Sequence, residues 1–451
     1  MQNDRPRSDN HRLPSIAHVE VAGSWGGSVL CLELYLRHCN PAALNHHALF
    51  YKQPPTEQQH NLSQPWPVTE LGLPAPTASS TGPGVSRRAL RGVLARVPRL
   101  RAFLREIHVA LKALADIPRA IRLARVFRAG GYDLVHSNNN FDYQVPTLLG
   151  AWLARKPLVA HVRTPRPLNW WRRRLSRIPV QLIAINQAVA DDLLRQKIKT
   201  PIVICHDPCA EPVAAPERVR GVRRELFGAG GEVLVGAVCR LEAWKGIDDL
   251  LEAARLLRVS WPCVRYVVVG SGAAGQHFRE LAARWGLLDI VHFAGYQRDS
   301  HAYSAACDIF VNASRVEGGP LVVLEAMMLG LPVVSTRVGM VPEWITHGRD
   351  GLIVEPSDPR ALAEALQSLL DDPAKRKALG ERATVRARQF GDPAARAREL
   401  DQVFRNLLRD LGRGVHPSHE LEASRRMHPE QILVSNERCS PIPAEGLASR
   451  E

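Results

Sequence analysis

The sequence predicts an α/β fold with two separate parallel-sheet units, because short apolar runs and helix-like segments alternate in two series. The first series extends from IAHVEVAG at residues 16–23 to VQLIAIN at 180–186, and the second begins with VLVGAVCR at 233–240. Residues 206–218, between the two series, follow neither pattern. The length of 451 residues is sufficient for two such units, each with its own hydrophobic core.

In the first series each expected strand is a short run rich in Val, Ile or Leu, and each expected helix spaces its apolar residues three or four positions apart. The strands are expected at 16–23, 46–52, 132–137, 157–163 and 180–186, and the helices at 29–39, 143–155, 170–178 and 187–197. Residues 53–86 are rich in Pro, Gln, Ser, Thr and Gly, which is typical of a loop with at most a short strand inside it.

The second series repeats this alternation. Strands are expected at 233–240, 265–272, 290–295, 309–314, 332–339 and 352–356, and helices at 247–258, 274–286, 301–308, 321–330, 341–348 and 359–372. Parallel strands end at the same edge of their sheet, so a ligand crevice is expected at the carboxyl ends of the strands, between the two units.

These patterns also predict domain boundaries. We expect a disordered N-terminus at 1–14, a first domain at 15–207 with a basic helical region at 85–128, a second domain at 219–385, closing helices at 386–411 that could return to the first domain, and a disordered tail at 412–451. The tail is assigned as disordered because it is polar and has no periodic pattern.

The composition excludes an integral membrane helix and favours a cytoplasmic protein. No run of 18 or more apolar residues is present, and the N-terminus lacks the apolar core of a secretory signal. The eight cysteines are scattered without a CxxC pair, which is typical of reduced thiols in the cytosol. Cys205 and Cys209 lie close together, but no second ligand pair stands at zinc spacing, so no metal is expected.

The net charge of +14 would fit a nucleic acid, an anionic lipid or a phosphorylated ligand as partner. Residues 85–128 contain twelve Arg or Lys and only two acidic residues, mixed with apolar residues at helical spacing. Together with the WWRRR run inside 170–177, this pattern predicts a surface that binds the anionic inner face of the plasma membrane. A helix pair with a solvated basic face, and indoles packed inward, are the alternatives. No nucleic acid partner is expected, because no binding-module signature accompanies the charge.

Residues 311–325, VNASRVEGGPLVVLE, combine a strand end, a glycine loop and the start of a helix. A helix N-terminus carries unpaired N–H donors and partial positive charge, which suit a phosphate. Gly318 and Gly319 would let a ligand approach the backbone closely. Glu317 in the loop and Glu325 in the helix add carboxylates for hydroxyl groups. The segment therefore predicts a nucleotide-sugar site.

Other candidate ligand groups follow neighbouring strands. Arg240 ends one strand and Lys245 precedes the next helix, where two cations would neutralise a diphosphate leaving group. Gly270 begins a GxGxxG motif, but no acidic residue follows the next strand to bind a ribose, so a turn near the donor is favoured over NAD binding. Gly26 and Gly27 could offer backbone N–H groups to a phosphate or acceptor, or could simply form a turn.

Two histidines, His136 and His161, stand at strand carboxyl ends in the first unit. Either could hydrogen-bond a sugar hydroxyl or carry part of a developing charge. A structural role inside the sheet is the alternative for both. Arg163 follows His161 by two positions, which predicts that it shares the same face of the strand.

The chain resembles the retaining glycosyltransferase family 4, which has the GT-B architecture of two facing Rossmann-like doubly wound parallel-sheet domains. Three segments of the second half carry the resemblance, in this order: GAVCRLEAWKGIDDLLEAA, EGGPLVVLEAMMLGLPVVST and GMVPEWITHGRDGLIVEPSD. The resemblance extends over residues 15–410 and is weaker in the first half, where GSWGGS, VHSNN and INQAVADDL match.

The resemblance implies transfer of a sugar from a nucleotide-diphosphate donor with retained anomeric configuration. By this resemblance Arg240 and Lys245 hold the diphosphate and Glu325 holds the ribose hydroxyls. Glu317 holds the donor sugar together with loop N–H groups, including that of Leu321. The leaving phosphate is expected to deprotonate the acceptor, so that no protein nucleophile, cofactor or metal is required.

Two positions depart from the family pattern. Gly319, whose N–H is also expected at the donor sugar, stands where relatives often carry a bulkier apolar residue, which leaves the donor preference open. Asn138 stands where many relatives have a histidine. The histidine that faces the sugar could therefore be His161 or His136.

The sequence thus predicts a cytoplasmic, membrane-surface glycosyltransferase with its donor on the second domain and a glycan or glycolipid acceptor on the first. The basic region favours a lipid-linked or anionic acceptor, as in cell-surface polysaccharide or glycolipid biosynthesis. The alternatives are a non-catalytic GT-B scaffold or sugar-binding protein, and a sugar-nucleotide epimerase. A scaffold would tolerate loss of the charged groups, and an epimerase would turn over the donor without an acceptor.

Overall fold

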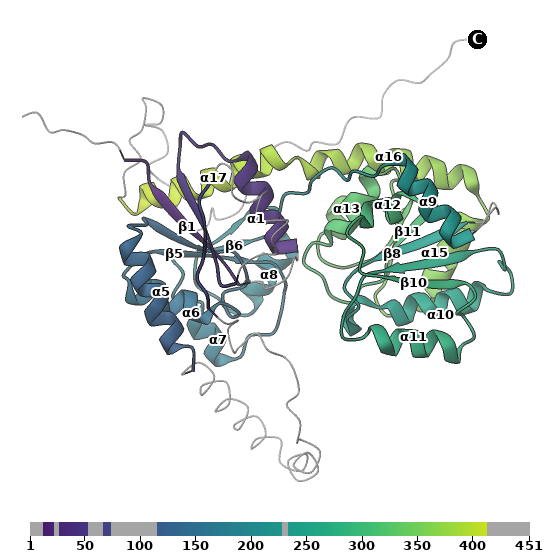
Figure 1. Cartoon of the computed structure of the whole chain (residues 1–451), viewed down its shortest axis with the longest axis horizontal. Coiled ribbons are helices and arrows are strands. Elements are labelled where there is room, and N and C mark those ends of the chain that lie inside the picture. The colour runs from purple at the N-terminus through teal and green to yellow at the C-terminus, as the bar shows by residue number, and fades with distance from the viewer. Residues whose placement is uncertain (1–11, 22–26, 53–65, 74–114, 228–232, 413–451) are drawn as a thin grey trace, which may run out of the picture.

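The computed structural model describes residues 12–21, 27–52, 66–73, 115–227 and 233–412. It has two α/β halves that lie side by side, with two long helices running across both (Figure 1). The halves are called here the first domain and the second domain. Several predictions lie outside the described residues: the disordered N-terminus up to residue 11, Gly26, the basic stretch 85–114, and the tail from 413 onward.

The first domain is built on a seven-stranded parallel sheet with strand order β3-β2-β1-β4-β5-β6-β7. Its strands are β1 (Ser15–Glu20), β2 (Asn45–Phe50), β3 (Val68–Glu70), β4 (Leu134–Ser137), β5 (Leu158–Val162), β6 (Gln181–Ala184) and β7 (Ile202–Ile204). Its helices are α1 (Gly27–His38), α5 (Ile117–Ala129), α6 (Val145–Leu153), α7 (Trp170–Leu175) and α8 (Gln187–Arg195). Most of these strands are buried on both faces, as expected where helices cover a parallel sheet.

The second domain is built on a six-stranded parallel sheet with strand order β10-β9-β8-β11-β12-β13. Its strands are β8 (Leu234–Val238), β9 (Arg265–Val269), β10 (Val291–Gly295), β11 (Ile309–Asn312), β12 (Val333–Thr336) and β13 (Leu352–Val354). Its helical segments are α9 (Pro216–Phe227), η2 (Ala243–Lys245), α10 (Ile247–Leu257), α11 (Gly275–Arg284), α12 (Ser300–Ala305), α13 (Leu321–Met328), α14 (Val341–Trp344) and α15 (Pro359–Leu370). The two helix-covered parallel sheets confirm the predicted fold class.

Two consecutive helices, α16 (Pro373–Gly391) and α17 (Pro393–Asp410), connect the domains. Ala383 and Ala387 of α16 belong to a core of the second domain, whereas Phe404 of α17 belongs to a core that α17 shares with α1 and the first sheet. Asp401 of α17 accepts a hydrogen bond of 2.6 Å from the hydroxyl of Tyr35. The chain therefore ends its described part on the domain in which it began (Figure 1).

Each sheet reverses its strand order at one point, between β1 and β4 in the first domain and between β8 and β11 in the second. The loops after the two strands at such a point diverge to opposite faces of the sheet and leave a crevice that commonly binds ligands. The loop after β8 carries Arg240 and Lys245, and the loop after β11 carries Glu317. The topology therefore brings the predicted donor residues to one place.

A row of four histidines crosses the first sheet beneath α17. The ring nitrogens of His46 and His18, of His18 and His136, and of His136 and His161 are each 2.8 Å apart. All four side chains are buried, and Phe404 of α17 lies over the row, 5.2 Å from the ring of His136. Burial lowers the pKa of all four histidines, to about 3 for His46.

None of the helices in the described ranges is long and apolar enough to cross a membrane.

The histidine row predicts a loss of stability in mild acid. The four imidazoles stay neutral in the folded protein, whereas in the unfolded chain they protonate near a pKa of about 6.5. The free energy of unfolding should therefore fall as the pH decreases below about 6.5, by up to about 1.4 kcal/mol per pH unit for each histidine. Denaturant unfolding at about pH 7.5 and 5.5 measures this slope. His46→Gln should reduce this pH dependence by about the contribution of one histidine. An unchanged slope would show that the four histidines do not take up the protons.

Candidate active site

The loop after β8 presents the predicted diphosphate ligands. Arg240 follows the end of β8 with an exposed side chain, and η2 then leads to Lys245, which precedes α10. Gly246, the N-cap residue of α10, has a φ of +64°, a conformation that favours glycine. A Cβ at Gly246 would lie 2.0 Å from the carbonyl oxygen of Ala313, so the loop after β11 rests directly on the loop after β8.

Arg315 connects these two loops through hydrogen bonds and ion pairs. Its backbone N–H donates to the carbonyl of Trp244 at 2.7 Å, and its guanidinium donates to Asp248 at 2.8 Å and to Asp249 at 2.7 Å. The carboxylates also suit the first turn of α10, where the helix dipole favours negative charge. Sequence reasoning did not select Arg315. The signal it could have used is the pair of adjacent acidic residues at a helix start.

Glu317 and Lys245, predicted from separate motifs, form an ion pair between the carboxylate Oε1 and the ammonium Nζ. Both side chains are largely buried, with exposed fractions of 14% and 15%. The hydroxyl of Ser314 lies 3.0 Å from the same carboxylate oxygen. A cation and an anion are therefore held together at the crevice, where an anionic ligand could compete for Lys245 and its hydroxyls for Glu317.

Glu325 lies on α13, in the helical turn after the glycine loop, and its Oε2 is 3.7 Å from Nε2 of His301 on α12. The neighbouring carboxylate of Glu325 raises the pKa of His301. Leu321 is the first residue of α13, with Pro320 at the N-cap position. Sequence reasoning missed His301, because the contact joins two helices whose relative placement no local pattern gives.

Gly318 is a point at which the second domain lies directly against the first. A Cβ at this position would lie 1.6 Å from the carbonyl oxygen of Arg163, at the end of β5, so no residue with a side chain fits without movement. A Cβ at the next position, Gly319, would have its nearest neighbour at 3.4 Å, the sulfur of Met340, which is ordinary contact. The two glycines of the loop therefore differ in what they require.

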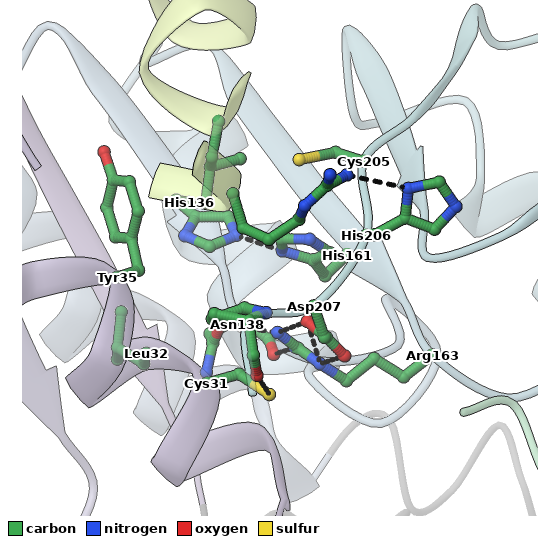
Figure 2. A pocket seen from close by; sticks show the side chains of 13 residues that line it. Cys31, Leu32, Tyr35, His136, Asn138, His161, Arg163, Cys205, His206 and Asp207 are labelled. Atoms are coloured by element: carbon green, nitrogen blue, oxygen red, sulfur yellow. Dashed lines mark hydrogen bonds and ion pairs between the residues drawn. The ribbon is translucent and has the colours of Figure 1, made fainter. Parts of the chain in front are cut away.

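On the side of the first domain, Arg163 is anchored by Asp207. Its Nε and Nη2 donate to the two carboxylate oxygens at 2.9 and 2.8 Å, and a further nitrogen, Nη1, donates to the backbone carbonyl of Asn138 (Figure 2). The amide of Asn138 in turn donates to Glu20 at 2.6 Å. The cavity in Figure 2 has a volume of only about 10 Å³, room for about one water molecule. The guanidinium of Arg163 is therefore engaged by Asp207 and by the backbone of Asn138, and it is not free for a ligand.

The two predicted histidines differ in what they offer to a substrate. Both ring nitrogens of His136 are hydrogen-bonded to neighbouring histidines, and its side chain is fully buried. His161 is also buried and uses its Nδ1 for His136, and both histidines line the cavity beside Asn138 and Arg163. The two therefore differ in their bonds: His136 is bonded to two histidines of the row and His161 to one.

The remaining glycines have mainly structural surroundings. Gly270 has a φ of +131°, and a Cβ there would lie 1.9 Å from the carbonyl oxygen of Cys239, so the loops after β8 and β9 require glycine where they meet. Gly27 is the first residue of α1, and a Cβ there would meet open space. Within the part of the chain that the structure describes, no group of three His, Cys, Asp or Glu side chains is placed to hold a metal ion.

Comparison with known proteins identifies the family. The model of the glycosyl transferases group 1 family matches residues 222–386. The chain is 33% identical over 318 residues to a D-inositol 3-phosphate glycosyltransferase of Corynebacterium aurimucosum, covering 63% of this chain and 74% of the relative. It is 30% identical over 306 residues to the enzyme of that name from Streptomyces avermitilis, covering 60% of this chain and 65% of the relative. The chain therefore belongs to the glycosyl transferases group 1 family and is a glycosyltransferase, which confirms the resemblance.

Solved structures show the same architecture. The fold is similar to that of HepE from Anabaena in complex with UDP and glucose, with a TM-score of 0.67 and 21% identity, covering 86% of this chain and 99% of that one. It is also similar to sucrose-phosphate synthase from Thermosynechococcus elongatus, with a TM-score of 0.62 and 19% identity, covering 88% and 100%. These likenesses concern the fold, and they confirm the two-domain GT-B architecture.

The contrast between the two loop glycines predicts different effects of the same substitution. Gly318→Ala should force the loop away from Arg163 by an ångström or more, and such a displacement at a catalytic site can cost about 100-fold in rate. Gly319→Ala, the matched control, should cost much less. Steady-state transfer assays and circular dichroism on both variants check this. Equal losses of activity in the two variants would contradict the contact between the domains.

Proposed function

We propose that the chain transfers a sugar from a nucleotide-diphosphate sugar to a glycan or glycolipid acceptor with retention of the anomeric configuration. The observation that carries this proposal is the pairing of Glu317 with Lys245 at the strand-order reversal of the second sheet, with Arg240 on the same loop. The site combines fixed positive charge for a diphosphate with carboxylates for hydroxyl groups. The HepE structures with UDP, and with UDP and glucose, support a donor of this chemical class.

In this proposal each group of the second domain has one task. Arg240 and Lys245 hold the diphosphate and stabilise the charge that grows on it as the bond to the sugar breaks. Glu325 accepts hydrogen bonds from the ribose hydroxyls, and Glu317 accepts them from the donor sugar. The backbone N–H groups of Gly319 and Leu321 add donors at the helix start, where the helix dipole also favours an anion.

The chemistry proceeds on one face of the sugar. The leaving phosphate oxygen takes the proton of the acceptor hydroxyl while that hydroxyl oxygen bonds to the anomeric carbon, so the configuration is retained without a protein nucleophile. Glu317 acts here as a ligand of the sugar, which is consistent with its engagement by Lys245 and Ser314. No cofactor or metal takes part in this proposal.

The first domain supplies the acceptor side. His161, at the end of β5, is proposed to contact the donor sugar or the acceptor. His136, with both nitrogens bonded, is proposed to orient His161 through their 2.8 Å hydrogen bond. Gly27, at the start of α1, leaves open space for a phosphate or acceptor. Relatives named for D-inositol 3-phosphate support an acceptor that carries phosphate.

The donor assignment is testable in two steps. A screen of UDP-, GDP- and ADP-sugars by thermal shift should find one nucleotide that raises the melting temperature, because a ligand stabilises the state that binds it. With that donor, Glu317→Gln should lower kcat by about 100-fold or more while the fold is kept, since it removes a charge placed at the reacting sugar.

Lys245→Ala should weaken nucleotide binding, whereas Lys377→Ala, which removes an 81% exposed cation of α16, serves as the control. NMR of the product anomer checks retention. An inverted product, or full transfer by Glu317→Gln, would contradict the proposal; donor turnover without acceptor would instead indicate an epimerase.

We also propose that the enzyme is cytoplasmic and binds peripherally to the anionic inner face of the plasma membrane. The indole of Trp170 is 57% exposed and that of Trp152 is 64% exposed, and exposed arginines such as Arg122, Arg125 and Arg174 lie on the same group of helices, α5 to α7. Trp171, by contrast, packs against the core of the first domain. The predicted WWRRR segment therefore offers one indole to a surface and one to the core.

Vesicle flotation tests the membrane proposal. Vesicles with anionic phospholipid should carry the protein at low salt and release it as salt screens the charges, whereas neutral vesicles should not bind it. Trp170→Ala should lower the bound fraction several-fold because an exposed indole prefers the membrane interface. Failure to float on anionic vesicles at low salt would refute peripheral binding.

A further inference from the structure

Asn186 of the first domain contacts the loop that carries Glu317 in the second. It is the N-cap residue of α8, and its side chain is fully buried. The side-chain oxygen accepts a hydrogen bond of 2.7 Å from the N–H of Val189, which caps the helix. The side-chain nitrogen donates a hydrogen bond of 2.6 Å to the carbonyl oxygen of Gly318. One amide thus caps a helix in one domain and binds the backbone of the other.

The carbonyl of Gly318 is fixed from both sides. Within the second domain it accepts a hydrogen bond of 3.0 Å from the N–H of Met340, in the loop after β12. Gly339, with a φ of +50°, allows this approach, because a Cβ there would lie 2.2 Å from the same oxygen. The bond from Asn186 is the second bond to this carbonyl, and it exists only while the two domains are together. The carbonyl belongs to the residue directly after Glu317.

The chemistry of the side chain is specific. An N-cap requires only an acceptor, which Ser, Thr, Asp and Asn all provide. Contact with a carbonyl oxygen requires a donor at the same time. Asparagine offers an acceptor and a donor on one rigid amide, and both are used here. A residue that only capped the helix would not need a donor. The bond from the side-chain nitrogen of Asn186 to the carbonyl of Gly318 is therefore not explained by helix capping.

We propose that Asn186 is a positioning residue that couples domain closure to the placement of Glu317. This role rests on the proposed function, in which Glu317 contacts the donor sugar. When the domains close, the amide holds the 317–319 backbone in the orientation that keeps Glu317 beside Lys245 and directs the loop N–H groups into the crevice. When they open, the loop keeps only its bond to Met340. Closure, and not donor binding alone, then completes the site.

The proposal is tested by separating the two bonds of Asn186. Asn186→Ser keeps a cap acceptor but is too short to reach Gly318 as well. Asn186→Asp keeps the size and the cap but, when ionised at about pH 8, replaces the donor by an oxygen that faces an oxygen. Asn169→Ser is the matched control, because Asn169 caps α7 by the same kind of bond, at 2.9 Å from the N–H of Arg172.

Asn186→Ser should keep the melting temperature close to that of the wild type, and both Asn186 variants should keep the KM for the donor while kcat falls about 10- to 100-fold. Asn169→Ser should keep kcat. Unchanged kcat in the two Asn186 variants would overturn the proposal. So would a loss of kcat that follows an equal loss of thermal stability in both Asn186→Ser and Asn169→Ser, since that result would describe a helix cap only.

A second measurement does not depend on activity. Small-angle X-ray scattering with a saturating nucleotide should give a larger radius of gyration for Asn186→Asp than for the wild type and for Asn169→Ser, because the closed state has lost a bond. An identical radius in all three proteins would refute the coupling. If the wild type transferred no sugar at all, the proposed function would fail, and the scattering result would still decide whether Asn186 holds the domains together.

Discussion

The contact between the backbone of Gly318 and the carbonyl oxygen of Arg163 sets the geometry of the whole site. A Cβ at residue 318 would come within 1.6 Å of that oxygen, so the two domains can meet at this point only because the side chain is absent. Glu317 precedes this contact and the start of α13 follows it. The distance between the predicted donor-binding residues of the second domain and the strand ends of the first therefore depends on the absence of a side chain at residue 318.

The charges of the second domain are arranged so that the contact can persist without a ligand. Lys245 neutralises Glu317, and Arg315 is paired with Asp248 and Asp249, so the loops after β8 and β11 remain together. A bound nucleotide diphosphate would give Lys245 a second anionic partner while Glu317 stays beside it, so neither buried charge would be left unpaired. This is a favourable arrangement for a site that must bind and release an anion in each cycle, because an unpaired charge at such depth is costly.

The sequence was sufficient for the fold class and for selecting the two loops that bring Lys245 and Glu317 together, because these depend on local patterns: apolar runs, helix starts, and a glycine loop between them. It was not sufficient for contacts that depend on the register of distant strands. His18 and His136 are 118 positions apart and meet only because β1 pairs with β4. That pairing, together with the pairing of β4 with β5, also explains why both ring nitrogens of His136 are hydrogen-bonded, which its position at a strand end could not reveal. Asn186 and His301 were missed because their partners lie on other elements.

A crystal structure of the protein with the nucleotide diphosphate selected by thermal shift would show directly which groups bind the donor. We expect the diphosphate within hydrogen-bond distance of Arg240 and Lys245, with the ribose at Glu325 and with Gly318 still against Arg163. A nucleotide bound to the first domain, or one that leaves the pair of Lys245 and Glu317 undisturbed and far from its phosphates, would contradict this expectation.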